Sequence, residues 1–344
     1  WVHALERYER VSRGYQALLE DATGDVTLAS NTHELVVRFL SALPWERRRS
    51  IVTTDAEFHS IRRQVDRLAE TGRVEVVKVP GYPAGDVAAR LAAKVDEGTA
   101  CVLVSAVFFE RGHVVPGLRG LADACARHGA ELLVDAYHAL GAMPFRLTDH
   151  GLDDAFVVGG GYKYLQLGEG NCFLRTPPGC DLRPVYTGWF SEFGELGEER
   201  APGEVRYGKG SARFAGSTYD PTSHYRGAAV LDFFDDQELT PELLREVSQH
   251  QVGLLVSTFE GLDLDPAVVR LDDGVDLRGR GGFLALTAPD AAGLSSALRQ
   301  RGVHTDSRGH VLRFGPAPYL ADAQVTAAME ALGEVVSEDS RPPR

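Results

Sequence analysis

One lysine stands between two tyrosines in the stretch GGGYKYLQLGEG, residues 159–170, directly after the apolar run AFVV. Such a run is typical of a buried strand, so Lys163 follows a strand end. A lysine contributes nothing to a core, and three glycines cost backbone entropy. Both features make sense if the backbone bends sharply and something approaches Lys163 closely. A lysine in a partly apolar cleft loses affinity for its proton and can form a Schiff base.

Two further polar clusters are expected at strand ends. In VDAYHAL, Asp135 ends a strand and needs a cationic or N–H partner, which the sheet cannot supply. Asp135 and His138 could instead be metal ligands, but two ligands are too few to argue for a metal site. Ser30, Asn31 and Thr32 precede a helical run, where free N–H groups and the helix dipole bind phosphate. Plain N-capping is the alternative there.

Together these clusters supply what a pyridoxal phosphate enzyme requires: a phosphate cup, a Schiff-base lysine and a carboxylate that keeps a pyridine nitrogen protonated. Phe58, at another strand end, is the candidate to cover one face of the ring. A nicotinamide enzyme would show G-x-G-x-x-G after a first strand, and the glycine-rich stretch does not fit that spacing. A P-loop is absent as well. The sequence therefore predicts pyridoxal phosphate as cofactor and no metal.

The elements that position these residues alternate along the first two thirds of the chain. Because apolar strands separated by helices indicate a mostly parallel sheet, we expect an α/β fold with the ligand beyond the carboxyl ends of the strands. The predicted strands are 49–54, 74–79, 100–105, 131–136, 154–160 and 171–176. The predicted helical segments between them are 61–72, 87–95 and 118–129.

The rest of the chain predicts a second, smaller domain of α+β type. Helical segments at about 222–236 and 240–258 lead into it, and we place the boundary near residue 238. The expected division is a large domain at 1–238, with a helical segment at 1–22, a small domain at 239–338 and a disordered tail at 339–344. The glycine-rich run 191–210 is expected to be a long loop, either a solvated excursion or a mobile lid.

The composition argues against some classes of binding partner. The 344 residues carry a formal net charge of −13, which argues against nucleic acid or an anionic membrane, and no apolar run is long enough for a membrane span. The chain begins at Trp1, and we expect an N-terminal part to be missing from the numbering. The four cysteines show no metal-site spacing and predict reduced thiols of a cytoplasmic protein: Cys101, Cys125, Cys172 and Cys180.

The motifs on these elements resemble those of the class V aminotransferase superfamily, fold type I, and within it those of kynureninases. The resemblance runs from Trp1 to about residue 335. Its sharpest motifs are VDAYHALGAMPF and GYKYL, supported by TGWF at 187–190 and LRFGPAPY at 312–319. It implies a fold type I transferase-like protein with a large cofactor-binding domain and a small C-terminal domain.

The resemblance also implies a role for each matched position near the cofactor. Lys163 would hold the cofactor aldehyde, and Asp135 would pair with the pyridine nitrogen. Phe58 would stack on the ring, where cysteine desulfurases have a histidine, and Tyr162 would contact phosphate and act as an acid. The remaining cofactor contacts implied are His138 near the ring, the phosphate loop at Ser30, Asn31 and Thr32, and Trp189, Ser217 and Thr218 at the phosphate edge.

Other implications concern the substrate and a second subunit. Arg313 would hold the substrate α-carboxylate, because a guanidinium can grip both oxygens. The site at Ser217 and Thr218 is where a neighbouring subunit reaches the phosphate, so a homodimer with a shared active site is implied. Two departures are visible: Gly161 stands where the compared kynureninases have serine, and the residues around Asp220 differ from those that read the aryl ketone.

The predicted activity is therefore that of a pyridoxal phosphate enzyme acting on an α-amino acid. Kynureninase-like hydrolysis of a Cβ–Cγ bond leads, and a class V aminotransferase or a β-elimination C–S lyase are the alternatives on the same scaffold. Cysteine desulfurase is disfavoured because Cys180, the last cysteine, comes soon after Lys163. A non-catalytic scaffold is the alternative of another class. The sequence does not name the amino acid.

Overall fold

The computed structural model describes residues 2–197, 199–272 and 274–339. Trp1 and the expected tail beyond Asp339 lie outside the described residues. The chain divides into two compact units. Unit 1 comprises the chain up to Thr240 except for two short segments, Phe108–Val114 and Gly141–Met143, which join the residues after Thr240 in unit 2. The division after Thr240 falls close to the boundary expected near residue 238.

The core of unit 1 is a seven-stranded sheet in the order β1-β7-β6-β5-β4-β2-β3. Its strands are β1 (Asp25–Ala29), β2 (Ser50–Thr54), β3 (Glu75–Val79), β4 (Thr99–Ser105), β5 (Glu131–Asp135), β6 (Phe156–Gly160) and β7 (Cys172–Thr176). The pairs from β3 to β6 are parallel, whereas β7 runs antiparallel to both β6 and β1. The expectation of a mostly parallel α/β sheet is thus confirmed, although β1 was not predicted.

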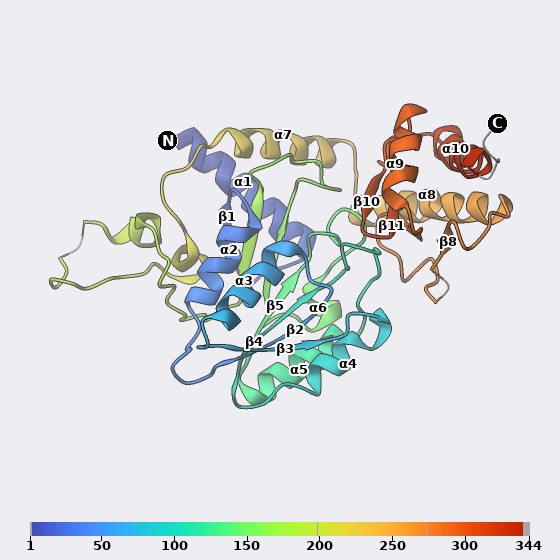
Figure 1. The fold of residues 1–344 in the computed structure, drawn as a ribbon. Helices are drawn as coiled ribbons and strands as arrows, with labels where there is room; N and C mark the ends of the chain where they lie inside the picture. The colour runs from blue at the N-terminus through green and yellow to red at the C-terminus, as the bar shows by residue number, and fades with distance from the viewer. Residues whose placement is uncertain (1, 198, 273, 340–344) are drawn as a thin grey trace. The chain divides into compact units, whose positions relative to one another are not determined.

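Helices between the strands bury the sheet. They are α2 (Thr32–Ser41), α3 (His59–Glu70), α4 (Val87–Ala92), α5 (Leu118–His128) and the short α6 (Leu147–His150). Every residue of β4 is buried, as expected for a strand covered on both faces. One hydrophobic core joins α2 and α3 to the sheet, with Phe39 against Phe156 at a ring-centroid distance of 4.9 Å. Figure 1 shows α2 and α3 lying over the strands in blue.

Two more helices of unit 1 come from opposite ends of its sequence. α1 (Val2–Leu19) packs against α7 (Thr222–Asp236), and Arg10 forms ion pairs with Asp232 and Asp235. On its other side, Tyr15 of α1 stacks on Phe173 of β7 at 4.2 Å between ring centroids. The helical segment expected at 1–22 therefore corresponds to α1 and is fixed to the sheet.

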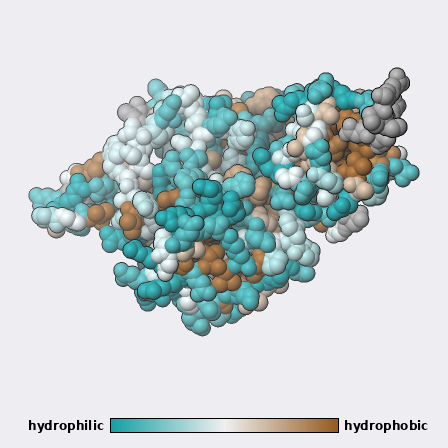
Figure 2. Space-filling view, in the orientation of Figure 1, coloured by the Kyte–Doolittle hydropathy of each residue, from teal (hydrophilic) through white to brown (hydrophobic). Residues whose placement is uncertain are grey.

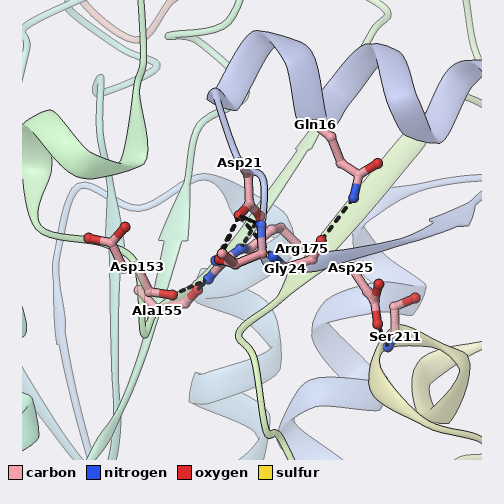
Figure 3. Close-up of polar contacts among 9 residues, drawn as sticks. Gln16, Asp21, Gly24, Asp25, Asp153, Ala155, Arg175 and Ser211 are labelled. Carbon is pink, nitrogen blue, oxygen red and sulfur yellow. Dashed lines mark hydrogen bonds and ion pairs between the residues drawn. The ribbon is translucent and has the colours of Figure 1, made fainter.

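A buried ion pair fixes the chain between α1 and β1 (Figure 3). Arg175 of β7 is fully buried and donates to both carboxylate oxygens of Asp21, at 2.6 and 3.2 Å. Its third nitrogen donates to the carbonyls of Asp153 and Ala155. Because each guanidinium nitrogen meets an acceptor and Asp21 carries the opposite charge, this buried charge is compensated. The pair joins the antiparallel strand β7 to the segment before β1, so it holds the added edge of the sheet.

Unit 2 is a smaller α+β unit, as expected for the second domain. Its sheet has the order β10-β11-β9-β8, formed by β8 (Arg270–Leu271), β9 (Leu284–Thr287), β10 (Asp306–Arg308) and β11 (Val311–Phe314). The helices α8 (Pro241–Gly261), α9 (Ala291–Gln300) and α10 (Asp322–Asp339) complete it. One hydrophobic core with Leu284, Leu312 and Met329 holds this unit together.

The expected loop at 191–210 contains little regular structure among its described residues. A 3-10 segment, η2 (Trp189–Glu195), begins just before it, and a second one, η3 (Gly210–Phe214), begins at its end. Figure 2 shows brown, hydrophobic side chains on the surface of this part of the molecule, which Figure 1 draws in yellow-green. Exposed apolar residues here are Val185, Tyr186, Trp189, Phe193, Leu196 and Val205.

No described helix combines the length and apolar character needed to cross a membrane.

Candidate active site

Lys163 lies in the turn that follows β6, with its amine between two aromatic rings. The Nζ atom is 5.4 Å from the centroid of the Phe58 ring and 4.9 Å from that of Tyr137. It also lies 2.5 Å from Nε2 of His138. The structure therefore brings together three predicted site residues, Lys163, Phe58 and His138, and adds Tyr137.

The turn that presents Lys163 is closed by backbone hydrogen bonds. Gly161 donates to Asn171 at 2.8 Å, and Leu167 donates back to Gly161 at 2.8 Å. Gln166 takes a positive φ of 55° inside the turn and donates to the Lys163 carbonyl at 3.1 Å. The sharp bend expected from the sequence is present, and it holds the lysine backbone in a closed loop.

The glycines before Lys163 serve packing within the protein. A Cβ on Gly160 would lie 2.6 Å from the Cys172 sulfur and 2.7 Å from the Tyr137 ring. A Cβ on Gly161 would lie 2.5 Å from the Leu167 side chain. Neighbouring side chains therefore fill the space beside these glycines, so small residues are needed there for packing.

Asp135 ends β5, as predicted, and is buried. Its Oδ1 accepts a 2.8 Å hydrogen bond from the backbone N–H of Tyr137. Burial raises the pKa of the Asp135 carboxyl, while the Tyr137 N–H and the positive charge of Lys163 oppose that shift. A carboxyl in this state readily shares a proton with a basic nitrogen. Asp135 thus has both kinds of partner expected for it: the backbone N–H of Tyr137 and the positive charge of Lys163.

Glu57 is a second buried carboxyl, close enough to Asp135 for their charges to interact, and the sequence did not single it out. Burial, with a smaller contribution from the charge of Asp135, raises the pKa of Glu57 to about 7. The hydroxyls of Thr54 and Ser105 donate to its two oxygens at 2.7 and 2.5 Å and oppose the shift. Glu57 directly precedes Phe58, so it lies next to a predicted cofactor contact.

The start of α2 confirms the capping alternative for Asn31. Its side chain accepts from the backbone N–H of Glu34 at 2.9 Å, as an N-cap does. Capping by the side chain leaves other N–H groups of the first turn available. A hydrogen bond from the Thr32 backbone reaches Cys172, and the Cys172 thiol also contacts Tyr137. The helix start is thus linked to the lysine through Cys172 and Tyr137.

The residues predicted at the phosphate edge gather around a cavity of about 660 Å³ in unit 1. Trp189, Ser217 and Ser30 line it, and the Trp189 indole N–H donates to Thr218 at 3.4 Å. The cavity is also lined by Tyr8, Phe193, Tyr219 and His224. Neither Lys163 nor Phe58 is among the described residues that line it. We call this region the aromatic cavity, and the group formed by Lys163, His138, Asp135, Tyr137 and Phe58 the lysine cluster.

The last two predicted residues are Tyr162 and Arg313, each with contacts of its own. Tyr162 is 55% exposed, and its backbone hydrogen-bonds to Tyr137. Arg313 belongs to unit 2, where it pairs with Asp306 and donates to the carbonyl of Phe109. Its guanidinium also faces the Phe283 ring at 5.3 Å.

The residues that sequence reasoning missed had weak signals. Tyr137 lies inside the predicted VDAYHAL motif, between Asp135 and His138, and a tyrosine after a strand end usually signals packing. Glu57 directly precedes Phe58, but an acid in the stretch TTDAEFHS is typical of an exposed turn. Neither signal could distinguish a buried partner from a surface residue.

The side chains of the lysine cluster suit the proposed cofactor chemically. An amine between two ring faces suits an aldehyde on an aromatic ring, and a buried acid suits a pyridine nitrogen. Both aromatic rings flank the amine, so a flat ring joined to Lys163 would meet apolar faces. The residues present therefore fit pyridoxal phosphate.

Two family models match the chain. The aminotransferase class-V model matches residues 26–171, and the kynureninase C-terminal domain model matches residues 244–332. The first match covers the lysine cluster, and the second covers most of unit 2. The first match thus falls mostly on unit 1 and the second on unit 2, in the order of the two predicted domains.

Relatives resemble the chain over nearly all its length at low identity. An uncharacterized aminotransferase, YcbU, from Bacillus subtilis (strain 168) is 22% identical over 96% of this chain and 85% of its own. A kynureninase from Geobacillus thermodenitrificans (strain NG80-2) is 23% identical over 92% of this chain and 74% of its own. At these identities both relatives remain distant.

Solved structures share the fold. An apo cysteine desulfurase from Thermococcus onnurineus NA1 superposes with a TM-score of 0.81 at 17% identity, covering 98% of this chain and 85% of its own. A complex of the cystine C-S lyase C-DES with cysteine persulfide gives a TM-score of 0.78 at 18% identity. The match covers 96% of this chain and 87% of that one. These likenesses establish a fold type I architecture.

Proposed function

We propose that this chain, a kynureninase-like member of the class V aminotransferase family and a pyridoxal phosphate-dependent enzyme, hydrolyses the Cβ–Cγ bond of an α-amino acid with an aryl-ketone side chain. Membership in this enzyme family sets aside the non-catalytic scaffold. The observation that carries the choice of reaction is the match of residues 244–332 to the kynureninase C-terminal domain. Phe58 supports it, because its ring faces Lys163 where a desulfurase-like site would have a histidine.

When bound, pyridoxal phosphate supplies an electron sink for a carbanion next to the amino group. Asp135 would pair as a carboxylate with the protonated pyridine nitrogen, because a positive charge beside this buried carboxyl favours its ionised form, as the charge of Lys163 does. Phe58 would cover one ring face and exclude water from it. Within the chain, the Tyr137 N–H fixes the orientation of the Asp135 carboxylate.

Lys163 would hold the cofactor covalently and later move the substrate α-proton at its Nζ atom. His138 is positioned to receive or return that proton, because Nε2 lies 2.5 Å from Nζ. Tyr162, which is exposed, would donate a proton late in the cycle. Arg313 would bind the substrate α-carboxylate through its two terminal nitrogens.

A phosphate site is proposed at the start of α2 and at the edge of the aromatic cavity. The free N–H groups of the first turn, with Ser30 and Thr32, would bind the phosphate oxygens. Trp189, Ser217 and Thr218 are the other proposed contacts. Since Trp189 is 42% and Phe193 52% exposed, we propose that a second copy of the chain covers this surface in a homodimer with a shared active site.

Among the alternatives, transamination is favoured by the likeness to an aminotransferase from Bacillus subtilis. Cysteine desulfurization finds less support, because it needs an activated thiolate. Burial raises the pKa of all four thiols, those of Cys101, Cys125, Cys172 and Cys180. The free state of these cysteines is consistent with the cytoplasmic location that we propose.

The test is a product assay on the purified protein supplied with pyridoxal phosphate. L-kynurenine and 3-hydroxykynurenine are each incubated with the protein, and the products are separated by chromatography. Alanine together with an anthranilate in equal amounts supports the hydrolysis. A keto acid that accumulates with an amino acceptor would assign an aminotransferase, and pyruvate with ammonia from another amino acid would assign a β-elimination.

A further inference from the structure

Glu57 is a buried carboxyl for which the proposed reaction has no use. It lies in the turn between β2 and α3, with 2% of its surface exposed. Thr54, at the end of β2, donates its hydroxyl proton to Oε1 at 2.7 Å. Ser105, at the end of β4, donates to Oε2 at 2.5 Å. Each carboxylate oxygen is therefore tied to the carboxyl end of a different strand.

These two hydrogen bonds connect the residues that flank the proposed cofactor ring. Phe58 follows Glu57 in the chain and starts α3 with no side-chain cap of its own. Ser105 is the register partner of Asp135, and the N–H of Ala106 donates to the Asp135 carbonyl at 2.9 Å. A path of adjacent contacts thus runs from Phe58 through Glu57 and Ser105 to Asp135.

Burying an acid here is costly, and the cost itself indicates a role. Burial raises the pKa of Glu57 to about 7, and the charge of Asp135 adds to the effect. A carboxylate accepts from both hydroxyls at once, one at each oxygen. A neutral amide accepts only at its oxygen, so one hydroxyl would have to turn and accept from the amide NH2 group. Residues that weaken a fold are expected where function requires them.

We propose that Glu57 is a positioning residue of the cofactor site, whose carboxyl holds the turn carrying Phe58 against the strand end carrying Asp135. The proposal rests on the proposed function only in that pyridoxal phosphate binds at Lys163; it does not depend on the substrate. Glu57 acts through Phe58 and Asp135 and needs no contact with the ring. Substitution of Glu57 should leave Lys163 in place and loosen the packing of Phe58 and Asp135 around it.

The experiment compares cofactor binding in wild-type, Glu57→Ala, Glu57→Gln and Ser105→Ala proteins. The apoprotein of each is titrated with pyridoxal phosphate, and the affinity and visible circular dichroism of the bound cofactor are recorded. We expect Glu57→Ala to lower the affinity about tenfold and to weaken the dichroic band, because two hydrogen bonds to the turn are lost. Glu57→Gln should keep most of the wild-type affinity and most of the dichroic band. Ser105→Ala should fall between, since it cuts only the link to β4.

A double-mutant cycle with Phe58→Ala tests the route of the effect. If Glu57 acts through Phe58, the two alanine substitutions together should cost less than the sum of their separate effects on affinity. Glu131→Gln is the matched control, because Glu131 is a partly buried acid with a raised pKa at the opposite end of β5 from Asp135. It should leave affinity and dichroism unchanged.

Several outcomes would overturn the proposal. A folded Glu57→Ala protein with wild-type affinity and dichroism would do so, as would full additivity with Phe58→Ala. If Glu57→Ala does not fold, Ser105→Ala carries the same test, and wild-type behaviour of that variant contradicts the positioning role. A wild-type protein that binds no cofactor would instead contradict the proposed function, so the two failures are distinguishable.

Discussion

The lysine cluster and the aromatic cavity differ in how complete each is within one chain. In the lysine cluster, the amine of Lys163 meets two ring faces and His138, and Asp135 accepts from a backbone N–H. In the aromatic cavity, Trp189 and Phe193 leave large apolar surfaces in solvent. The side chains of the lysine cluster thus contact one another within one chain. The aromatic cavity, in contrast, leaves apolar side chains exposed.

The start of α2 connects the two regions. Ser30 lines the aromatic cavity, while the Thr32 backbone reaches Cys172, which contacts Tyr137 of the lysine cluster. A phosphate bound at this helix start would therefore lie between the regions. We infer from this difference that one chain would hold the reactive end of the proposed cofactor and that a second copy would complete the phosphate edge.

The largest expected effect removes the centre of the lysine cluster. Lys163→Ala should lower turnover by at least about 1,000-fold, because Lys163 is the residue proposed both to hold the cofactor and to move the α-proton. The far-UV circular dichroism should remain that of the wild type. Lys94→Ala, which removes an exposed lysine, is the control and should keep full turnover. Turnover retained by the Lys163 variant would mean that the cluster is not the catalytic region.

The next effect concerns stability and pH in the lysine cluster. The folded-state pKa of Glu57 is about 7 against an ordinary value of 4.5, so the folded protein binds more protons than the unfolded chain between these pH values. Stability therefore falls as pH rises through this window, with a total cost of about 3 kcal/mol above it.

Glu57→Gln should remove this dependence and raise the free energy of unfolding of the apoprotein at pH 8 relative to wild type. Urea unfolding at pH 4.5 and pH 8 measures it. Glu246→Gln, which alters an exposed carboxyl on α8, should change neither value. If Glu57→Gln shows the same pH dependence as wild type, Glu57 is already ionised in the folded wild-type protein at ordinary pH.

A smaller effect is expected outside both regions, at Arg313. Arg313→Ala should raise KM for the amino acid about 30-fold, since a charge-assisted hydrogen bond pair to the carboxylate is lost. Cofactor affinity should change less than about twofold. Steady-state kinetics and a cofactor titration measure the two quantities. Equal losses in both would assign Arg313 a structural role in unit 2.

The smallest effect sharpens the role of the aromatic cavity. Trp189→Phe keeps an aromatic ring and removes the N–H that donates to Thr218. Cofactor affinity should fall by less than about tenfold, as for one hydrogen bond. Light scattering should show whether Trp189→Ala, which removes apolar surface, also weakens a dimer. A monomeric wild-type protein at working concentration would contradict the proposed second copy.

Much of the fold followed from sequence pattern. The predicted strands that end near the site coincide with β2 to β7 to within two residues at each end. Asp135 and Lys163 therefore follow strand ends as expected. The strand β1, Asp25–Ala29, escaped prediction because it is a short edge strand of five residues, without the continuous apolar run that marks the central strands. Its antiparallel pairing with β7 depends on contacts far apart in the sequence.

The details around Lys163 could not be read from one sequence. The glycines before Lys163 indicated a bend, but the close neighbours of Gly160, Tyr137 and Cys172, come from other parts of the chain. Glu57 looked like a surface acid, because a charged residue gives no sign of burial until its partners are known. Asn31 had two possible roles, and only the geometry showed its side chain acting as a cap. Local pattern fixes elements, and tertiary contacts decide what their side chains meet.

The most direct test of the central claim is to locate the lysine that holds the cofactor. The chain has four lysines, Lys78, Lys94, Lys163 and Lys209, so the answer is unambiguous. The protein loaded with pyridoxal phosphate is reduced with borohydride, digested and mapped by mass spectrometry. We predict a pyridoxyl group on Lys163 and unmodified peptides for the other three. A label on another lysine, or none on Lys163 when the cofactor is bound, would contradict the account.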